Sequence, residues 1–228
     1  MKQLAGILKE KQLIQRGVLY AFGIFLVALG AAFTIVANLG VSAIQAVPLV
    51  LSLVTGLSIG TCLFFVLALF ILLQVLILRK EFRWISLTQL LVSFLFGYFM
   101  DFSIFLLRNL QSSTYLVQFL MLLAGITLFA NGLLLYVRGN LINMPPEGLT
   151  VALTKKIPNT TFHRVRIVQD CSLVAIAGVL SLLLLHGVYG IREGTLLSAV
   201  LIGKLQPYVG RLWRPVLHRI GLEAEAAS

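Results

Sequence analysis

Long apolar runs, separated by short polar connections, organise the whole chain. Six runs are about 20 residues long, which is the length that an α-helix needs to cross a hydrocarbon core of about 30 Å. They occupy residues 17–37, 60–78, 84–107, 115–137, 165–185 and 191–213. Two further apolar segments, 43–55 and 145–157, are too short to cross and predict re-entrant or half-crossing helices. The pattern predicts an all-α polytopic membrane protein with six transmembrane helices and two short half helices.

The composition supports lipid as the surrounding solvent. The 228 residues are 59% hydrophobic and only 11% charged, and the mean hydropathy is +1.00, values that exclude an ordinary soluble domain. We expect a single membrane domain over residues 1–228, because no polar linker interrupts the pattern, with 214–228 as a cytoplasmic tail. The first apolar run follows a basic stretch, as in a signal peptide, but it lacks a clear cleavage site and is interpreted as a membrane helix.

Positive charge is unevenly distributed along the chain, which carries 18 Lys and Arg against 8 Asp and Glu, a net charge of +10. This excess would suggest nucleic acid in a soluble protein, but in a membrane protein Lys and Arg collect in the cytoplasmic connections. Fifteen basic residues fall on one side of the predicted membrane, at 2, 9, 11, 16, 79, 80, 83, 138, 155, 156, 164, 166, 211, 214 and 219. The opposite connections hold only Arg108 and Arg192. We therefore expect both termini in the cytoplasm, the lipid bilayer as a partner, and no nucleic acid.

The two halves of the sequence resemble each other when one is shifted by 102 residues. The shift aligns Gly23 with Gly125, Ala28 with Ala130, Gly30 with Gly132, Asn38 with Asn140, Leu39 with Leu141 and Leu51 with Leu153. Each half has three predicted crossings, so residues 16–110 and 115–213 would enter the membrane from opposite sides. Inverted repeats are typical of secondary transporters, which bind solute near the bilayer midplane at the ends of broken helices. The aligned glycines predict close packing of the first and fourth spans.

The start of the second short segment has the residues of a helix N-terminus. Asn143 is a candidate cap, Pro145 and Pro146 suit a first turn, and Glu147 lies where the helix dipole favours an anion. Glu147 is interpreted either as local stabilisation of this helix or as a site for a proton or cation. The corresponding start of the first short segment contains Ser42 and Gln45, and helix N-termini at membrane depth attract anionic groups.

Four polar residues lie inside predicted spans: Asp101, Asn131, Asp170 and Lys204. A charged side chain near the bilayer centre costs at least about 2.5–3.5 kcal/mol, so it normally faces a cavity or a partner. An ion pair between Asp101 and Lys204 is one hypothesis, and Asp170 is placed to pair with Arg164 or Arg166 one turn away. The predicted solute or ion site comprises Asn38, Ser42, Gln45, Asp101, Asn131, Asn143, Glu147 and Lys204.

Neither metal chemistry nor covalent catalysis is indicated by the sequence. Cys62 and Cys171 both lie in apolar runs and are interpreted as small buried hydrophobic residues, and the three histidines have no metal-ligand spacing. No hydrolase, zinc-protease, phosphate-loop or dinucleotide motif occurs. We therefore expect a protein that is not an enzyme and that needs no cofactor.

Four short motifs carry a resemblance to a known family. They are Asn-Leu-Gly-Val-Ser (38–42), Ser-Ile-Gly (58–60), Pro-Pro-Glu-Gly-Leu (145–149) and Gly-Thr-Leu-Leu-Ser-Ala-Val-Leu-Ile-Gly (194–203). Over most of its length, 16–203, the chain resembles the bacterial YczE/YyaS/YitT-like membrane proteins. The resemblance implies a protein of the bacterial plasma membrane whose activity is poorly defined and is often guessed to be transport, and it supplies no catalytic residues. The chain departs from the family pattern at Ala43, where a proline is expected, and at Lys204, where an uncharged residue is expected.

Three functions fit the predicted architecture. The first is a small-solute transporter in which the two inverted repeats alternate access, and Lys204 would suit a small anion or carboxylate. The second is a solute-capturing membrane subunit that works with an ATPase partner. The third is a scaffold or regulator whose basic connection, 155–166, engages anionic lipid or a partner. A homo-oligomer is compatible with all three.

Overall fold

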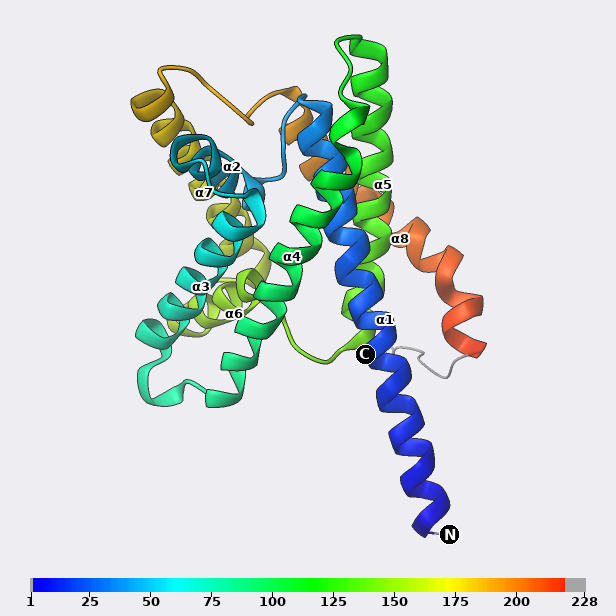
Figure 1. Ribbon diagram of the computed structural model, residues 1–228. Coiled ribbons are helices and arrows are strands. Elements are labelled where there is room, and N and C mark those ends of the chain that lie inside the picture. The colour runs from blue at the N-terminus through cyan, green and yellow to red at the C-terminus, as the bar shows by residue number, and fades with distance from the viewer. Residues whose placement is uncertain (1, 220–228) are drawn as a thin grey trace.

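The computed structural model describes residues 2–219, and the side chains of residues 13–218, as a set of helices without strands (Figure 1). The α-helices are α1 Lys2–Ala37, α2 Ala43–Thr55, α3 Ile59–Leu78, α4 Gln89–Leu107, α5 Tyr115–Gly139, α6 Pro145–Lys156, α7 Phe162–Leu185 and α8 Glu193–Arg219. Short 3₁₀ turns cover Arg79–Glu81, Trp84–Thr88 and Arg108–Leu110. The predicted all-α polytopic membrane fold is confirmed, as are the positions of both short helices.

Five of the described helices, rather than the six predicted, are both long and apolar enough to cross a membrane. They are the apolar part of α1 from Leu13 to Ala37, α3, α4 with its preceding turn, α5 and α7. The basic stretch before residue 17, predicted as a connection, continues α1 back to Lys2. The chain beyond 219, which includes most of the predicted tail, lies outside the described residues.

Helix α8 explains the difference in the number of spans. It has 27 residues, but Lys204, Gln206 and Arg211 interrupt its apolar sequence, and prolines occur at 207 and 215. It nevertheless lies alongside α5, because Gly194 at its start lies against Leu122 and Gly210 lies against Leu134. The predicted sixth span is therefore one helix that runs along much of α5 but lacks the continuous apolarity of the other spans.

The central contact of the fold is the antiparallel pair of α1 and α5, which make the most extensive helix–helix contact in the described chain. Gly23 lies on the backbone of Gly132, and Gly30 lies on the backbone of Gly125. A Cβ atom at any of these four positions would meet backbone atoms of the other helix. The predicted close packing of these two spans is therefore confirmed, with backbone against backbone.

The remaining helices attach to this pair in a reciprocal arrangement. Helix α4 packs on α1, and α8 packs on α5. Helix α2 packs on α3 and α7, whereas α6 packs on α7 and α3. Figure 1 shows α2, α3, α6 and α7 gathered on one side of the α1–α5 pair. Each short helix thus lies between a helix of its own half and a helix of the other half.

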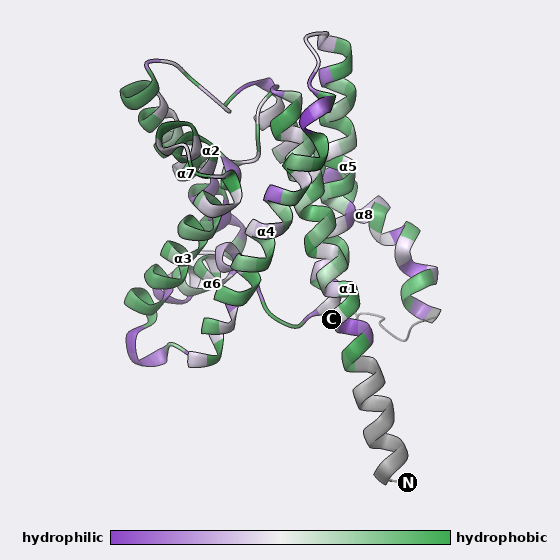
Figure 2. Cartoon of the chain, in the orientation of Figure 1, coloured by the Kyte–Doolittle hydropathy of each residue, from purple (hydrophilic) through white to green (hydrophobic). Residues whose placement is uncertain are grey.

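The outer surface of the bundle is apolar, as expected of helices in lipid. Leu91, Leu183 and Leu196 have 72%, 68% and 75% of their surface exposed, and hydrophobic residues dominate the helices in Figure 2, whereas hydrophilic residues concentrate at connections. Cys62 is buried, but Cys171 is exposed, so its interpretation as a buried residue is wrong. An apolar run does not by itself tell which of its faces points outward.

Helices α1 and α5 both end at an asparagine in the left-handed conformation. Helix α1 is followed by Asn38 with φ of 55°, and α5 is followed by Asn140 with φ of 46°. Asparagine is one of the few residues besides glycine that adopts this left-handed conformation readily, and it ends helices in the same way. The Asn-Leu pairs at 38–39 and 140–141 therefore break the long helices shortly before α2 and α6 begin.

Substitution of Gly30 by alanine tests the α1–α5 contact. The added methyl group would press on backbone atoms of Gly125 and Phe129, so we expect Gly30→Ala to lower the free energy of unfolding by about 1–3 kcal/mol. Gly17→Ala, in the same helix but with open space around the new methyl group, is the matched control and should leave stability nearly unchanged. Thermal unfolding in detergent measures both, and equal melting temperatures for the two variants would contradict the role of the contact.

Candidate functional site

The first turn of α2 contains buried polar groups without partners. Gln45 is only 1% exposed, yet neither its Nε2 nor its Oε1 atom makes a hydrogen bond, and the buried Ser42 Oγ makes none either. Ser42 occupies the N-cap position of α2 without capping the helix through its side chain. Buried polar groups are normally hydrogen-bonded, and an amide offers two donors and an acceptor oxygen. The start of α2 therefore carries hydrogen-bonding capacity that the described chain does not use.

Proline 48 adds to this unused capacity. It lies inside α2 and has no N–H group, so the carbonyl of Ile44 lacks the usual partner four residues later. Pro48 and Ala46 are buried with Gln45, which keeps these polar atoms away from the surface. The arrangement can hold a small group that both donates and accepts hydrogen bonds.

Helix α6 begins with the two predicted prolines, Pro145 and Pro146, but its N-cap is Met144. The predicted cap, Asn143, is exposed. The Met144 backbone N–H instead donates to Tyr136 Oη at 2.7 Å, and Tyr20 Oη donates to the Ile142 carbonyl at 2.8 Å. The prediction for Asn143 is wrong because tyrosines of α5 and α1 bind the chain before the helix.

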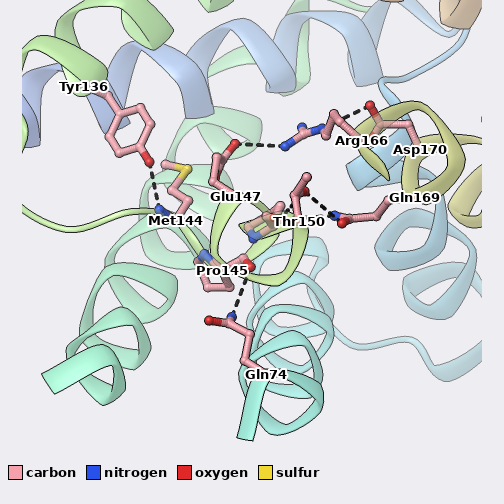
Figure 3. A network of polar contacts seen from close by, with 10 residues as sticks. Gln74, Tyr136, Met144, Pro145, Glu147, Thr150, Arg166, Gln169 and Asp170 are labelled. Atoms are coloured by element: carbon pink, nitrogen blue, oxygen red, sulfur yellow. Dashed lines mark hydrogen bonds and ion pairs between the residues drawn. The ribbon is translucent and has the colours of Figure 1, made fainter. Parts of the chain in front are cut away.

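Neutral side chains of α3, α7 and α6 itself hold the first turn of α6 in place (Figure 3). Gln74 of α3 donates to the Pro145 carbonyl at 3.2 Å and to Gln89 Oε1 of α4 at 3.1 Å. The Thr150 hydroxyl donates to the Pro146 carbonyl at 2.8 Å, and Gln169 Nε2 of α7 donates to the same carbonyl at 3.3 Å. These bonds fix α6 between α3 and α7.

An ion cluster joins α6 to α7. Arg166 Nη1 lies 3.1 Å from Glu147 Oε1, and Arg166 Nε lies 3.1 Å from Asp170 Oδ2. The two ion pairs appear side by side in Figure 3. The predicted pairing of Asp170 is therefore confirmed, with Arg166 as its partner. The second oxygen of Glu147, Oε2, is buried and has no hydrogen-bond partner in the described chain.

Asp101 binds the start of α3 and does not form the hypothesised pair with Lys204. Its Oδ2 accepts from Ser58 Oγ at 2.6 Å, and its Oδ1 accepts from the Gly60 N–H at 2.7 Å. Lys204 is exposed on α8, and it takes part in none of the ion pairs of the described residues. The hypothesis is wrong because free N–H groups at a helix start satisfy the carboxylate.

Two further predicted site residues have structural partners. Asn131 Oδ1 accepts from Trp213 Nε1 at 2.8 Å, which fastens α8 to α5. The Asn38 carbonyl accepts from Arg192 Nη1 at 3.0 Å, and Asn38 lines a surface hollow of about 310 Å³ with Gln111, Ser112 and Gln118. Among the eight predicted residues, Ser42, Gln45 and Glu147 retain unused polar atoms, whereas Asp101 and Asn131 hold helices together. The other three are Asn38, beside the surface hollow, and the exposed Asn143 and Lys204.

Sequence reasoning missed most of the cluster around α6. Gln74, Gln89, Thr150 and Gln169 are buried and were not among the predicted site residues, and the pairing of Arg166 with Glu147 was not predicted. A glutamine within a long apolar run is the signal that could have identified Gln74. Among the described residues, no three His, Cys, Asp or Glu side chains come together in a way that could hold a metal ion.

Removal of Arg166 tests whether the ion cluster stabilises the fold. Arg166→Leu would leave two carboxylates without a cation, so we expect the free energy of unfolding to fall by about 3 kcal/mol, near the lower limit for buried pairs because these side chains are partly exposed. Arg164→Leu, two residues away at an exposed position, should change stability little. Denaturation of the two variants in detergent compares them, and a fully stable Arg166→Leu protein would contradict the prediction.

Comparison with known proteins identifies a family but no activity. A family model described as a family of unknown function, DUF6198, matches residues 14–210. The match extends from the apolar part of α1 to the middle of α8 and so includes both short helices. No curated protein and no solved structure matches the chain. Because the family model covers most of the sequence, the chain belongs to the DUF6198 family of unknown function.

Proposed function

We propose that this protein is a small-solute transporter of the bacterial plasma membrane that works by alternating access of two inverted repeats, with both termini in the cytoplasm. The observation that carries the proposal is the pair Gln45 and Glu147. They occupy the first turns of α2 and α6, 102 residues apart, and both present buried polar atoms without partners. Unused hydrogen-bonding groups at the ends of two half helices are what a midplane solute site requires.

The helix contacts support an inverted repeat. A shift of 102 residues relates α1 to α5, α2 to α6, α3 to α7 and α4 to α8. Under this exchange the contact of α2 with α7 becomes the contact of α6 with α3, and the contact of α1 with α4 becomes that of α5 with α8. The glycine contacts obey the same exchange, because the pair Gly23–Gly132 becomes the pair Gly125–Gly30.

The solute that we propose is small and polar, with hydrogen-bond donors and acceptors. Gln45 and Ser42 are neutral and can bind either kind of group. The sequence argument for an anion or carboxylate depended on Lys204, and that side chain is exposed on α8. Glu147 adds a carboxylate oxygen, which favours a donor over an anion. A neutral polar solute therefore suits these residues better than a carboxylate does.

Two other functions remain distinguishable from transport. For a regulator that acts through its basic connection, Lys155 and Lys156 would need to be free, but they bind Glu81 Oε2 and Oε1 at 2.7 and 2.6 Å. For a capture subunit, an ATPase should co-purify with the protein, and reconstitution of the chain alone should give binding without flux. The resemblance to YczE/YyaS/YitT-like proteins and a homo-oligomeric state stay predictions.

Substitution of Gln45 by leucine tests the proposed site. Gln45 has no hydrogen bond to lose, so Gln45→Leu should keep or raise the free energy of unfolding. Gln74→Leu, in contrast, should lower the free energy of unfolding by about 1–3 kcal/mol, because it leaves the partners of Gln74 unsatisfied.

A thermal-shift screen of the wild-type protein against small polar metabolites and ions should yield a stabilising solute, because a ligand of the folded state raises the melting temperature.

The variants then decide where that solute binds. We expect Gln45→Leu to lose the thermal shift and the uptake of the solute into proteoliposomes, and Lys204→Ala, at an exposed position, to retain both. A solute that stabilises Gln45→Leu as strongly as the wild type would contradict the site. The absence of any stabilising solute for a well-folded protein would contradict the transport function.

A further inference from the structure

The ion cluster at α6 has more carboxylates than cations. Arg166 is bound by both Glu147 and Asp170, at 3.1 Å each, so with all three groups ionised the cluster carries one net negative charge. The Glu147 and Asp170 side chains are 26% and 37% exposed, and the cluster lies between helices of a membrane bundle. An uncompensated charge in such surroundings is unfavourable and is normally removed by a counter-ion or a proton.

The charged groups that act electrostatically on Glu147 are Arg166 and Asp170, of which only Arg166 is a cation. Tyr20 of α1 and Tyr136 of α5 interact electrostatically with Glu147, and both are neutral phenols bound to the chain before α6. Helices α3 and α4 face this turn with the neutral amides of Gln74 and Gln89, which lie against Gly148. On α7 the charged neighbours are Arg166 and Asp170, which already belong to the cluster.

The geometry favours Glu147 over Asp170 as the group that is neutralised. Its Oε2 atom is shielded from solvent and has no partner, whereas Asp170 is the more exposed of the two carboxylates. Burial raises the pKa of Glu147 above its ordinary value of 4.5, and the opposing effect of Arg166 does not cancel this increase. Helix α6 is not one of the helices long and apolar enough to span a membrane, and the Glu147 side chain keeps 26% of its surface exposed.

We propose that Glu147 binds and releases a proton at Oε2, and that this proton is the ion coupled to solute movement. A proton fits better than a metal cation, because Na⁺ or Ca²⁺ needs several oxygen ligands, whereas a single buried carboxylate oxygen of the cluster, Glu147 Oε2, lacks a partner and Arg166 lies beside it. With the proton bound, the cluster is neutral and Arg166 pairs with Asp170. With the proton released to water, both carboxylates share Arg166 and the cluster carries a negative charge, which favours contact of this turn of α6 with water over burial between the helices.

The coupling rests on the proposed transport function, but proton binding does not and can be measured without any solute. Infrared difference spectra of the full-length protein in lipid, recorded between neutral and alkaline pH, detect the C=O stretch of a protonated carboxyl group. We expect the wild-type protein to show this band at neutral pH and to lose it at alkaline pH. Glu147→Gln should abolish the band, because glutamine cannot ionise.

Two further variants separate a proton site from a structural role. Asp170→Asn leaves Arg166 to compensate Glu147 alone, so the band at neutral pH should disappear although Glu147 is present. Asp101→Asn, at a carboxylate that α3 satisfies, is the matched control and should retain the band. If Glu147→Gln fails to fold, the comparison of Asp170→Asn with Asp101→Asn still decides the question.

The pH dependence of stability gives a second measurement. A carboxyl group whose pKa is higher in the folded state contributes most below its ordinary pKa of 4.5, and its contribution falls as the pH rises through the raised value. The melting temperature of the wild-type protein should therefore fall as the pH rises above the ordinary pKa of 4.5. Glu147→Gln should remove most of this fall, and Asp101→Asn should not.

Three results would overturn the inference: no carboxyl band in the wild type at neutral pH, a band that survives in Glu147→Gln, or a band in Asp170→Asn equal to that of the wild type. A stabilisation that follows added Na⁺ at constant pH would assign the site to a metal cation and would also overturn it. A carboxyl band that behaves as expected, together with no stabilising solute in the metabolite screen, would refute the transport function and leave the proton site in place.

Discussion

The backbone contact between α1 and α5 is the constraint on which the other helix positions depend. Four glycines allow the two helices to approach until their backbones touch, and neither helix can shift along the other without bringing a side chain into this contact. In a bilayer the lipid is as apolar as the helix surfaces, so association depends on such close packing and on interhelical hydrogen bonds. The pair α1–α5 therefore acts as a rigid axis against which α4 and α8 pack.

A second constraint, the need to satisfy every polar group away from water, separates structural residues from candidate functional ones. Asp101 closes the start of α3, and Asn131 receives the indole N–H of Trp213. Each of these polar side chains makes bonds that remove the cost of its burial. Gln45 and Glu147 Oε2 are buried at the same cost without such bonds. Groups that the fold leaves unsatisfied are the ones for which a ligand or a proton provides an explanation.

The sequence predicted the helices well because their signals are local. Runs of apolar residues, the left-handed asparagines after α1 and α5, and the prolines of α6 each act within a few residues. The partners of polar side chains were predicted poorly because they depend on helix rotation. Lys204 and Asp101 lie at corresponding depths in the sequence, but the lysine faces outward and the aspartate faces α3. Asn143 is a good cap by type, but Tyr136 reaches the same helix end from α5.

The predicted sixth span is a second case in which sequence alone was insufficient, because tertiary contacts decide how α8 is held. Hydropathy alone marks residues 191–213 as a span, yet Lys204, Gln206 and Arg211 interrupt α8, which therefore lacks the long apolar stretch found in the five candidate spans. Gln206 donates to the Ala130 carbonyl at 3.2 Å and Trp213 binds Asn131, so α8 is held to α5 by polar bonds as well as by packing. These contacts arise from tertiary structure and leave no periodic signal in the sequence.

Helix α7 is the element that can transmit a change at α6 to α2. Near its start, Arg166 binds Glu147, and beyond its end the Gly190 carbonyl accepts from the Val41 N–H at 2.9 Å, just before α2. The same helix packs directly on both short helices. Under the proposed function, release of a proton from Glu147 adds a negative charge beside one end of α7, while the other end remains bound beside Ser42 and Gln45. The positions 45 and 147, which a shift of 102 residues relates, carry an amide and a carboxylate, and under the two proposals the first binds solute and the second binds the proton.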